Sequence, residues 1–275
     1  MIKAAVLLCL SVLAVGCSSP RKQQSTLTQS VLGERAYGAF LKGEHYVALE
    51  LYRRSYEQAR RADLINRAAH DRFNMGRVFY ELNELDSAIT AFSTAYDVMN
   101  RTDLVTEASI AASFVALCYA HRDDFATARR WHTTSASHGQ LGDRDFVTGT
   151  GARLDWMEKN DVNAITVFQE LSSLYKKKRD HSALARMYYY MAEIRFETRD
   201  MESVKNLLSE SLSSLDMAGQ RYWRWNVLLA LCVVHLCTGD ESAGNYYYYR
   251  ALKSLPDGTV IPSLEDLSRC RWIQN

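Results

Sequence analysis

Six copies of one pattern of small and large residues follow one another along the sequence. The first small position recurs at intervals of 40, 40, 36, 40 and 40 residues and is held by Ala48, Ala88, Ala128, Ala164, Val204 and Gly244. Twelve residues before each of these lies a second small residue: Ala36, Gly76, Ala116, Ala152, Ala192 and Cys232. Four residues after the first position comes a mostly large residue: Tyr52, Phe92, His132, Phe168, Leu208 and Tyr248. A nearly constant period of this kind is typical of a repeat protein.

The spacing within each unit predicts two helices joined by a short turn. In the second unit, Gly76 and Phe79 precede a polar break at Asn83–Glu84. After the break, Ala88 and Phe92 lie about one helical turn apart. The residue that opens the second helix is polar in every unit and suits a helix N-terminus: Glu44, Glu84, Asp124, Asn160, Asp200 and Asp240. One helix pair cannot bury both of its faces, so the pairs are expected to stack into an α-solenoid.

The order of small residue, aromatic, turn, alanine, aromatic and alanine resembles the tetratricopeptide repeat (TPR). The resemblance covers roughly residues 31–252 and is carried by segments such as Gly43–Ala59 and Asn74–Ala95. It implies an all-α fold, a right-handed α-solenoid of about six TPR-like helix pairs over residues 31–255, with a capping helix within residues 256–275. The usual period is about 34 residues. The longer beat resembles the forty-residue TPR variants, whose helices are about one turn longer.

The first residues have the features of a secretory leader. Lys3 precedes an apolar run from Ala4 to Val15, too short to span a bilayer comfortably. The sequence that follows, ending at Cys17, resembles the bacterial lipobox, in which cleavage leaves an acylated cysteine at the N-terminus. Residues 1–16 are therefore predicted as a lipoprotein signal peptide and residues 17–30 as a lipidated flexible tether. The alternative is an ordinary leader that happens to contain a cysteine.

Two further segments depart from the regular beat. His138–Gly151 holds four glycines and coincides with the 36-residue interval, which predicts a shortened second helix and a looser connection. This segment is either a deletion closed up by glycines or a hinge or groove-lining loop. At the other end, Pro262-Ser263 followed by Asp266 resembles a capping box and predicts a terminal helix over residues 262–273 that covers the last repeat.

The cysteines beyond the leader allow a disulfide but no zinc site. Cys118, Cys232, Cys237 and Cys270 follow Cys17. Cys232 holds a small packing position, which predicts a buried thiol. Cys237 and Cys270 either pair or stay free. The C-x-x-C spacing that a structural zinc site needs is absent from the sequence.

Sequence motifs for catalysis or cofactor binding are also absent. The seven histidines include no pair at i, i+4, and there is no G-x-S-x-G, P-loop or dinucleotide fingerprint. We therefore predict no enzymatic activity, no metal and no cofactor; a catalytic cluster assembled only in space is the alternative. Lys plus Arg number 33 and Asp plus Glu 32, so removal of Lys3 with the leader leaves a formally neutral chain. Broad attraction to nucleic acid is not expected.

The resemblance also implies a binding surface, since the first helix of each TPR pair lines the concave groove. The residues expected to face or border it are Phe73, Asn74, Arg77, Tyr80, Arg153, Trp156, Arg186, Tyr189, Tyr190, Glu193 and Phe196. Aromatic and arginine side chains dominate binding hot spots. Three of these, Tyr80, Trp156 and Phe196, could instead belong to the core between repeats. The Lys/Asn carboxylate clamp of some TPR proteins is not matched, since Gly33 and Tyr37 occupy its first positions.

These features predict a membrane-anchored periplasmic scaffold that holds a segment of a partner protein in its groove. The anchor would be acylated Cys17, and Ser18 after it resembles the sorting pattern for the outer membrane. The alternative is a small-ligand-binding or transport-associated periplasmic component with a pocket or pore in the solenoid. The sequence leaves the partner, the envelope process and the oligomeric state open.

Overall fold

The computed structural model describes residues 20–159, 161–255, 259 and 261–272, with backbone alone for 20–30 and 140. These residues form thirteen α-helices and one short 3₁₀ helix, and no strand. The helices that make the repeats are α1 (Pro20–Lys42), α2 (His45–Arg61), α3 (Ile65–Glu81), α4 (Leu85–Arg101), α5 (Val105–Ala120), α6 (Phe125–Ala136), α7 (Arg144–Lys159), α8 (Ala164–Lys178), α9 (His181–Glu197), α10 (Met201–Met217), α11 (Arg224–Cys237) and α12 (Glu241–Leu252). They make the six predicted pairs, so the all-α solenoid is confirmed.

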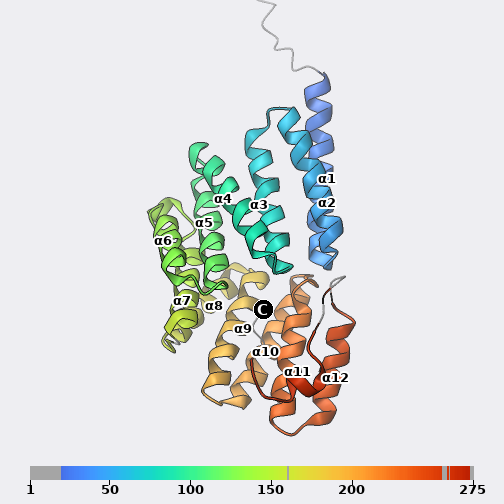
Figure 1. Ribbon diagram of the computed structural model, residues 1–275, viewed down its shortest axis with the longest axis vertical. Helices are drawn as coiled ribbons and strands as arrows, with labels where there is room; N and C mark the ends of the chain where they lie inside the picture. Colours follow the sequence, from blue (N-terminus) through green and yellow to red (C-terminus); the bar gives the residue numbers. More distant parts are fainter. Residues whose placement is uncertain (1–19, 160, 256–258, 260, 273–275) are drawn as a thin grey trace, which may run out of the picture.

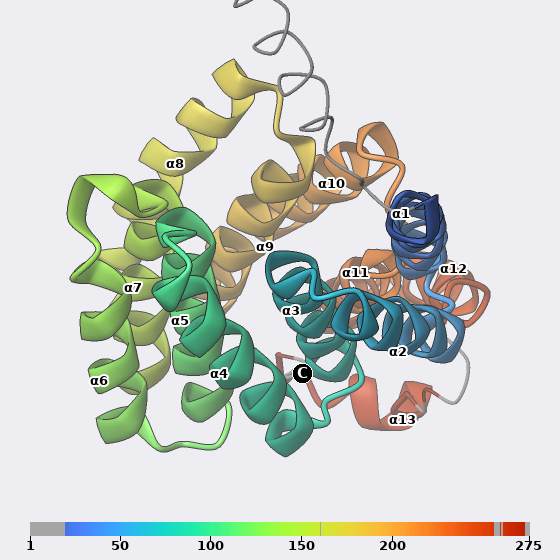
Figure 2. The same ribbon diagram turned by 90° about the horizontal axis from the view of Figure 1, so that it is seen from above.

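The six pairs wind around a common centre (Figure 1). Seen from above, α3 and α9 lie toward the middle of the ring, while α6 and α8 lie at its edge (Figure 2). The last two pairs lie beneath the first, so both ends of the solenoid meet. A backbone hydrogen bond from Arg221 N–H to Leu41 C=O, 2.8 Å long, joins them directly. The solenoid therefore returns on itself, and its inner face is enclosed by its own helices.

A residue in the left-handed conformation follows most of the repeat helices, and most of these residues recur at intervals of 20 residues. These residues with positive φ lie in the turns between helices, all but Gly219 two residues before the next helix begins: Gly43, Asp63, Asn83, Asp103, Asp123, Arg179, Arg199, Gly219 and Gly239. Glycine adopts this conformation without strain, and asparagine and aspartate tolerate it better than most residues. Most of these turns therefore have the residue types that the conformation favours.

The polar residues at the breaks differ in how they cap the following helix. Asp124, Asp200 and Asp240 each accept a hydrogen bond from the backbone N–H three residues later. Glu44 and Glu84 occupy the same position without a side-chain bond. The longer glutamate side chain does not fold back onto the helix start in the way that aspartate does.

The small residues lie where helices touch. All twelve members of the two small series are buried, including Gly76 and Ala88. A Cβ atom added at Gly76 would lie 2.8 Å from the ring of Phe92 on the partner helix α4. The aromatic ring therefore fills the space that the missing side chain leaves.

The irregular interval is explained by a short α6 of 12 residues and the 3₁₀ helix Gly139–Leu141 that follows it. The shortened second helix is thus confirmed. Two of the four glycines, Gly149 and Gly151, lie inside α7, and a Cβ at Gly151 would come within 3.0 Å of the His132 ring. Close helix packing explains these glycines better than a hinge does.

Both predicted ends need correction. Helix α1 begins at Pro20, so helical backbone replaces the flexible tether over residues 20–30. No glycine or proline from 21 to 32 interrupts the helix that the first repeat begins. The signal peptide and Cys17 lie outside the described residues.

At the other end, the terminal helix α13 is a single turn, Leu264–Leu267, which Ser263 caps through Asp266 N–H. The segment packs against the last repeat, as predicted: Leu267 belongs to the same buried cluster as residues of α11 and Ala251 of α12, and the Tyr248 hydroxyl donates to Pro262 C=O at 3.3 Å. A disulfide between Cys237 and Cys270, with Cα atoms 5.4 Å apart, ties it to the end of α11. Within the described part of the chain, no helix has the length and hydropathy that crossing a bilayer requires.

A pair of glycine substitutions tests the helix contact. Gly76→Val should lower the stability to urea by about 2–3 kcal/mol, because the new methyl groups displace the Phe92 ring. Gly38→Ala in α1 meets no atom within 4 Å and should raise stability by about 0.5–1 kcal/mol. Unfolding followed by circular dichroism measures both. Equal stability of Gly76→Val and the wild type would contradict this contact.

Candidate functional site

The predicted groove residues fall into three environments, which the faces of α9 illustrate. Arg186, Tyr190 and Glu193 follow one another at helical spacing and point toward a polar cluster at the centre of the ring. Tyr189 and Phe196 lie on the adjacent face and are buried among aromatic side chains. The third environment is the aromatic core between the second and third repeats, where Phe73 lies.

The polar cluster is centred on the carboxylate of Glu193. One oxygen of Glu193 accepts a hydrogen bond from Arg153 of α7 at 2.7 Å, and the other accepts from the Trp156 indole N–H at 3.0 Å. The Arg153 guanidinium also lies 4.6 Å from the centre of the Tyr190 ring. Glu193 and Trp156 are buried, and the side chain of Arg153 is 11% exposed. The ion pair and its hydrogen bonds offset the free-energy cost of removing these two charges from water.

A second contact links this cluster to the closure of the solenoid. Arg186 donates a hydrogen bond of 3.0 Å to the hydroxyl of Tyr222, which lies between α10 and α11. The Tyr222 ring packs against Phe40 of α1 with centroids 4.4 Å apart. The first, fifth and sixth pairs therefore meet through one tyrosine.

On the opposite side of the cluster, Tyr80 of α3 is hydrogen-bonded to His121 at the end of α5, with 2.9 Å between hydroxyl and Nε2. Burial lowers the pKa of His121 to about 4, and Arg153 adds to this effect. Burial raises the pKa of Tyr80. Both groups are therefore uncharged at neutral pH, and the pair acts as a polar contact between the second and third repeats.

Two charged side chains of α3 face the same centre. Arg77 lies over the Phe40 ring, 4.8 Å from its centroid. Burial raises the pKa of Glu81 to about 7, while Arg186 and Arg77 act in the opposite direction without cancelling the effect. Glu81 is thus a carboxyl group that gains or loses its proton near neutral pH. Asn74, one turn before Arg77, is half-buried.

Phe73 is not a groove residue, contrary to the prediction. Its ring lies 5.4 Å from Phe92 and 5.7 Å from Phe114, between the second and third repeats. Contacts with Phe92 of α4 and Phe114 of α5 place the Phe73 ring in the core between these two pairs.

Tyr189 is also corrected from a groove to a covered position, and Phe196 is buried in agreement with the alternative that it belongs to the core. The Tyr189 ring lies 4.7 Å from Trp223 and 5.4 Å from Trp272, and Phe196 lies 5.3 Å from Trp272. The disulfide-tied C-terminal segment thus lies over this face of α9, which explains why Tyr189 is only 4% exposed. Trp156 is buried as well, in agreement with the alternative that it belongs to the interior.

The inner face also contains residues that the sequence did not identify: Phe40, Glu81, His121 and Tyr222. Glu81 lies one turn after Arg77 on the same helix face, so the repeat pattern could have found it. Tyr222 lies in a connection, and only the curvature of the solenoid brings it to α9.

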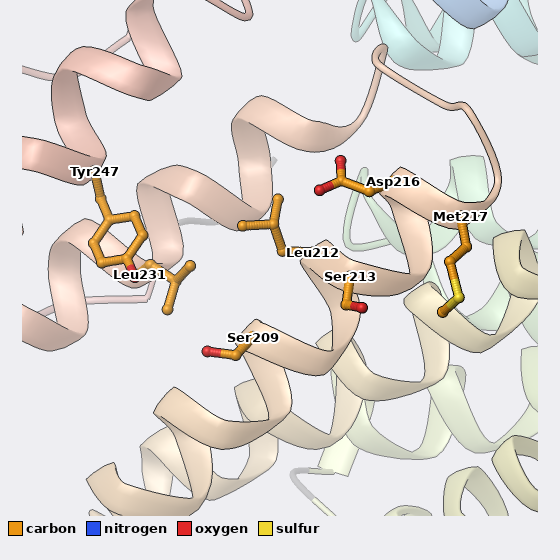
Figure 3. A pocket seen from close by; sticks show the side chains of 7 residues that line it. All are labelled: Ser209, Leu212, Ser213, Asp216, Met217, Leu231 and Tyr247. Carbon is orange, nitrogen blue, oxygen red and sulfur yellow. The ribbon is translucent and has the colours of Figure 1, made fainter.

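An open pocket lies on the outer surface, away from this cluster. Its volume is about 510 Å³, and its lining comes from α10, α11 and α12 (Figure 3). The lining residues are Ser209, Leu212, Ser213, Asp216, Met217, Leu231 and Tyr247. None of the predicted groove residues is among them.

Comparison with known proteins gives a likeness of fold. No protein-family model and no curated protein matches the sequence. A crystal structure of a Rap protein complexed with competence and sporulation factor is similar over 90% of this chain and 78% of that chain, with a TM-score of 0.63 and 10% identity. The Rap conjugation gene regulator of the plasmid pLS20, in complex with the Phr* peptide, is similar over 94% of this chain and 79% of that chain, with a TM-score of 0.55 and 13% identity. The shared feature is the solenoid of stacked helices.

Substitution of Glu81 tests the enclosure of the inner face. The folded-state pKa of about 7 exceeds the ordinary value of 4.5. The stabilising contribution of protonation is therefore fully present below about pH 4.5 and is lost as pH rises through about 7. Between pH 5 and 8, the wild type should lose up to about 3 kcal/mol of stability relative to Glu81→Gln.

Urea unfolding at a series of pH values measures this difference. Glu170→Gln, at an exposed position on α8, is the control and should follow the wild type. Parallel pH profiles of the wild type and Glu81→Gln would show that the Glu81 carboxyl is not enclosed as described.

Proposed function

We propose that the protein is a membrane-anchored scaffold that binds a segment of a partner protein on the inner face of its solenoid. The observation that carries this proposal is the meeting of guanidinium and phenol groups from separate repeats. Arg77 and Tyr80 come from α3, Arg153 from α7, and Arg186 and Tyr190 from α9. All five side chains are half-buried, so a ligand can reach them although they are partly shielded from water. Arginine and tyrosine contribute most to binding in such partly desolvated positions.

The structural comparisons support a peptide as the kind of ligand. The plasmid-encoded Rap regulator that shares this fold is in complex with a peptide. At 13% identity, its likeness extends to fold alone, and its binding residues are not transferred to this chain. On this basis we propose a short chain segment as the ligand of the inner face.

The sequence before the solenoid supports the anchor. The apolar run from Ala4 to Val15 ends at the lipobox-like cysteine, Cys17, and Ser18 suits the periplasmic face of the outer membrane. Several acyl chains hold a protein stably, whereas a single chain gives only marginal binding. In this arrangement α1, which begins at Pro20, lies three residues from the lipid-bearing cysteine and holds the first repeat close to the membrane.

The outer pocket supports a second candidate, a small-ligand-binding or transport-associated component. Leu212 and Leu231 give the pocket an apolar floor, and Asp216 and the hydroxyl of Tyr247 add polar groups. A volume of about 510 Å³ is within the range of small-molecule sites. This candidate predicts that a small molecule raises the melting temperature of the protein when no protein partner is present. The Leu231→Trp substitution should abolish that rise, because the larger side chain would occupy the pocket.

Photocrosslinking in the native envelope tests the scaffold. A photoreactive residue at Asn74, on the inner-facing side of α3, is expected to trap one protein partner. Asn74 is chosen because it is half-buried beside Arg77 and is not part of the paired cluster. The matched control is Arg54, an exposed position on α2.

A partner trapped at Asn74 and absent at Arg54 supports the scaffold and identifies its ligand. No protein adduct at Asn74, in a variant that is folded and membrane-bound, contradicts it. Equal trapping at both positions also contradicts the inner-face site, because it shows nonspecific contact.

A further inference from the structure

The inner face carries an excess of positive charge. Arg77, Arg153 and Arg186 contribute three positive charges, and Glu81 and Glu193 at most two negative ones. The difference of one charge is a lower limit, because it counts both carboxyl groups as ionised. Charges enclosed by protein need counterions, since desolvation otherwise costs several kcal/mol per ion.

One of the two carboxylates is fully committed. The oxygens of Glu193 accept separate hydrogen bonds from Arg153 and from the indole N–H of Trp156. Glu193 therefore neutralises Arg153, and within the described residues no hydrogen bond or ion pair joins it to Arg77 or Arg186. Arg77 and Arg186 are left with Glu81 as their acidic neighbour.

Glu81 neutralises these two arginines only in part. Burial raises its pKa to about 7, so at neutral pH the carboxyl group is protonated about half of the time. Within the described part of the chain, neither Arg77 nor Arg186 forms an ion pair. Two guanidinium groups thus share less than one negative charge.

The present contacts of the two arginines are with uncharged groups. Arg186 donates to the Tyr222 hydroxyl, and Arg77 lies over the Phe40 ring. A guanidinium has five N–H donors, so both arginines retain donors for a further acceptor. Arginine forks match a planar carboxylate with two parallel hydrogen bonds.

We propose that Arg77 and Arg186 form the carboxylate-binding site for the segment held on the inner face. The segment presents either its free C-terminal carboxylate or an acidic side chain to them. This inference rests on the proposed function, and it adds the chemistry that selects the ligand.

Three synthetic pools of acetylated hexapeptides test the inference on the purified full chain. The first pool has a free C-terminal carboxylate and no acidic side chain. The second has an amidated C-terminus and one glutamate. The third has an amidated C-terminus, with glutamine in place of that glutamate. Peptides retained by the protein are separated by gel filtration and quantified by mass spectrometry.

The wild type should retain the first or the second pool at least about tenfold more than the third, which corresponds to the energy of one charge-assisted contact. Whichever pool is enriched identifies the source of the carboxylate. Arg77→Gln and Arg186→Gln should each remove this preference. Tyr222→Phe keeps Arg186 and removes only its present hydrogen bond, so it should keep the preference.

Because Arg186 also supports the closure of the solenoid, Arg77→Gln is the variant on which the conclusion depends. Equal retention of all three pools by the wild type overturns the carboxylate site and leaves the scaffold in place. An unchanged preference in folded Arg77→Gln overturns it as well. Retention of none of the pools overturns the inference, whereas the scaffold is decided separately by photocrosslinking at Asn74 and Arg54.

Discussion

Close contact between a small residue on one helix of a pair and a large side chain on the other sets the distance between the two helices, as at Gly76 with Phe92 and at Gly244 with Leu236. At Gly76 the ring of Phe92 occupies the place that a Cβ would need. Left-handed residues such as Asn83 and Asp123 end the helices at a regular interval, so the same contact recurs. Each pair is then added to the last with a similar displacement. The curvature of the solenoid follows from the repetition of this small contact rather than from any long-range bond.

Curvature in turn produces the inner face. The ring of six pairs brings Arg221 to Leu41 and places Tyr222 between Phe40 and Arg186. Burial on the inner face raises the pKa of Glu81 to about 7, and it explains why Arg153 and Glu193 are paired. The same enclosure leaves two arginines short of negative charge. Stability and binding are therefore coupled, because an anionic ligand would supply the counterion that the folded chain lacks.

The sequence was sufficient to predict the pairs, their turns and the short α6, because these depend on spacing within one repeat. It also brought together Arg153, Arg186, Tyr190 and Glu193 as inner-face residues. Tyr189 was misplaced because the segment carrying Trp272, which covers it, lies outside the repeat pattern. Contacts such as that of Tyr222 with Phe40 depend on the sum of many small rotations between pairs, which no local pattern encodes.

The closure of the solenoid is the claim on which the inner face depends, and a distance across it is the most direct test. Nitroxide labels at Lys42 and Arg221, both exposed, would lie on either side of the backbone contact between the first and last pairs. The structure predicts a single short and narrow distance by electron paramagnetic resonance. A long or broad distribution would show an open solenoid, in which Tyr222 does not reach Phe40 and the arginines of the inner face are separated by solvent.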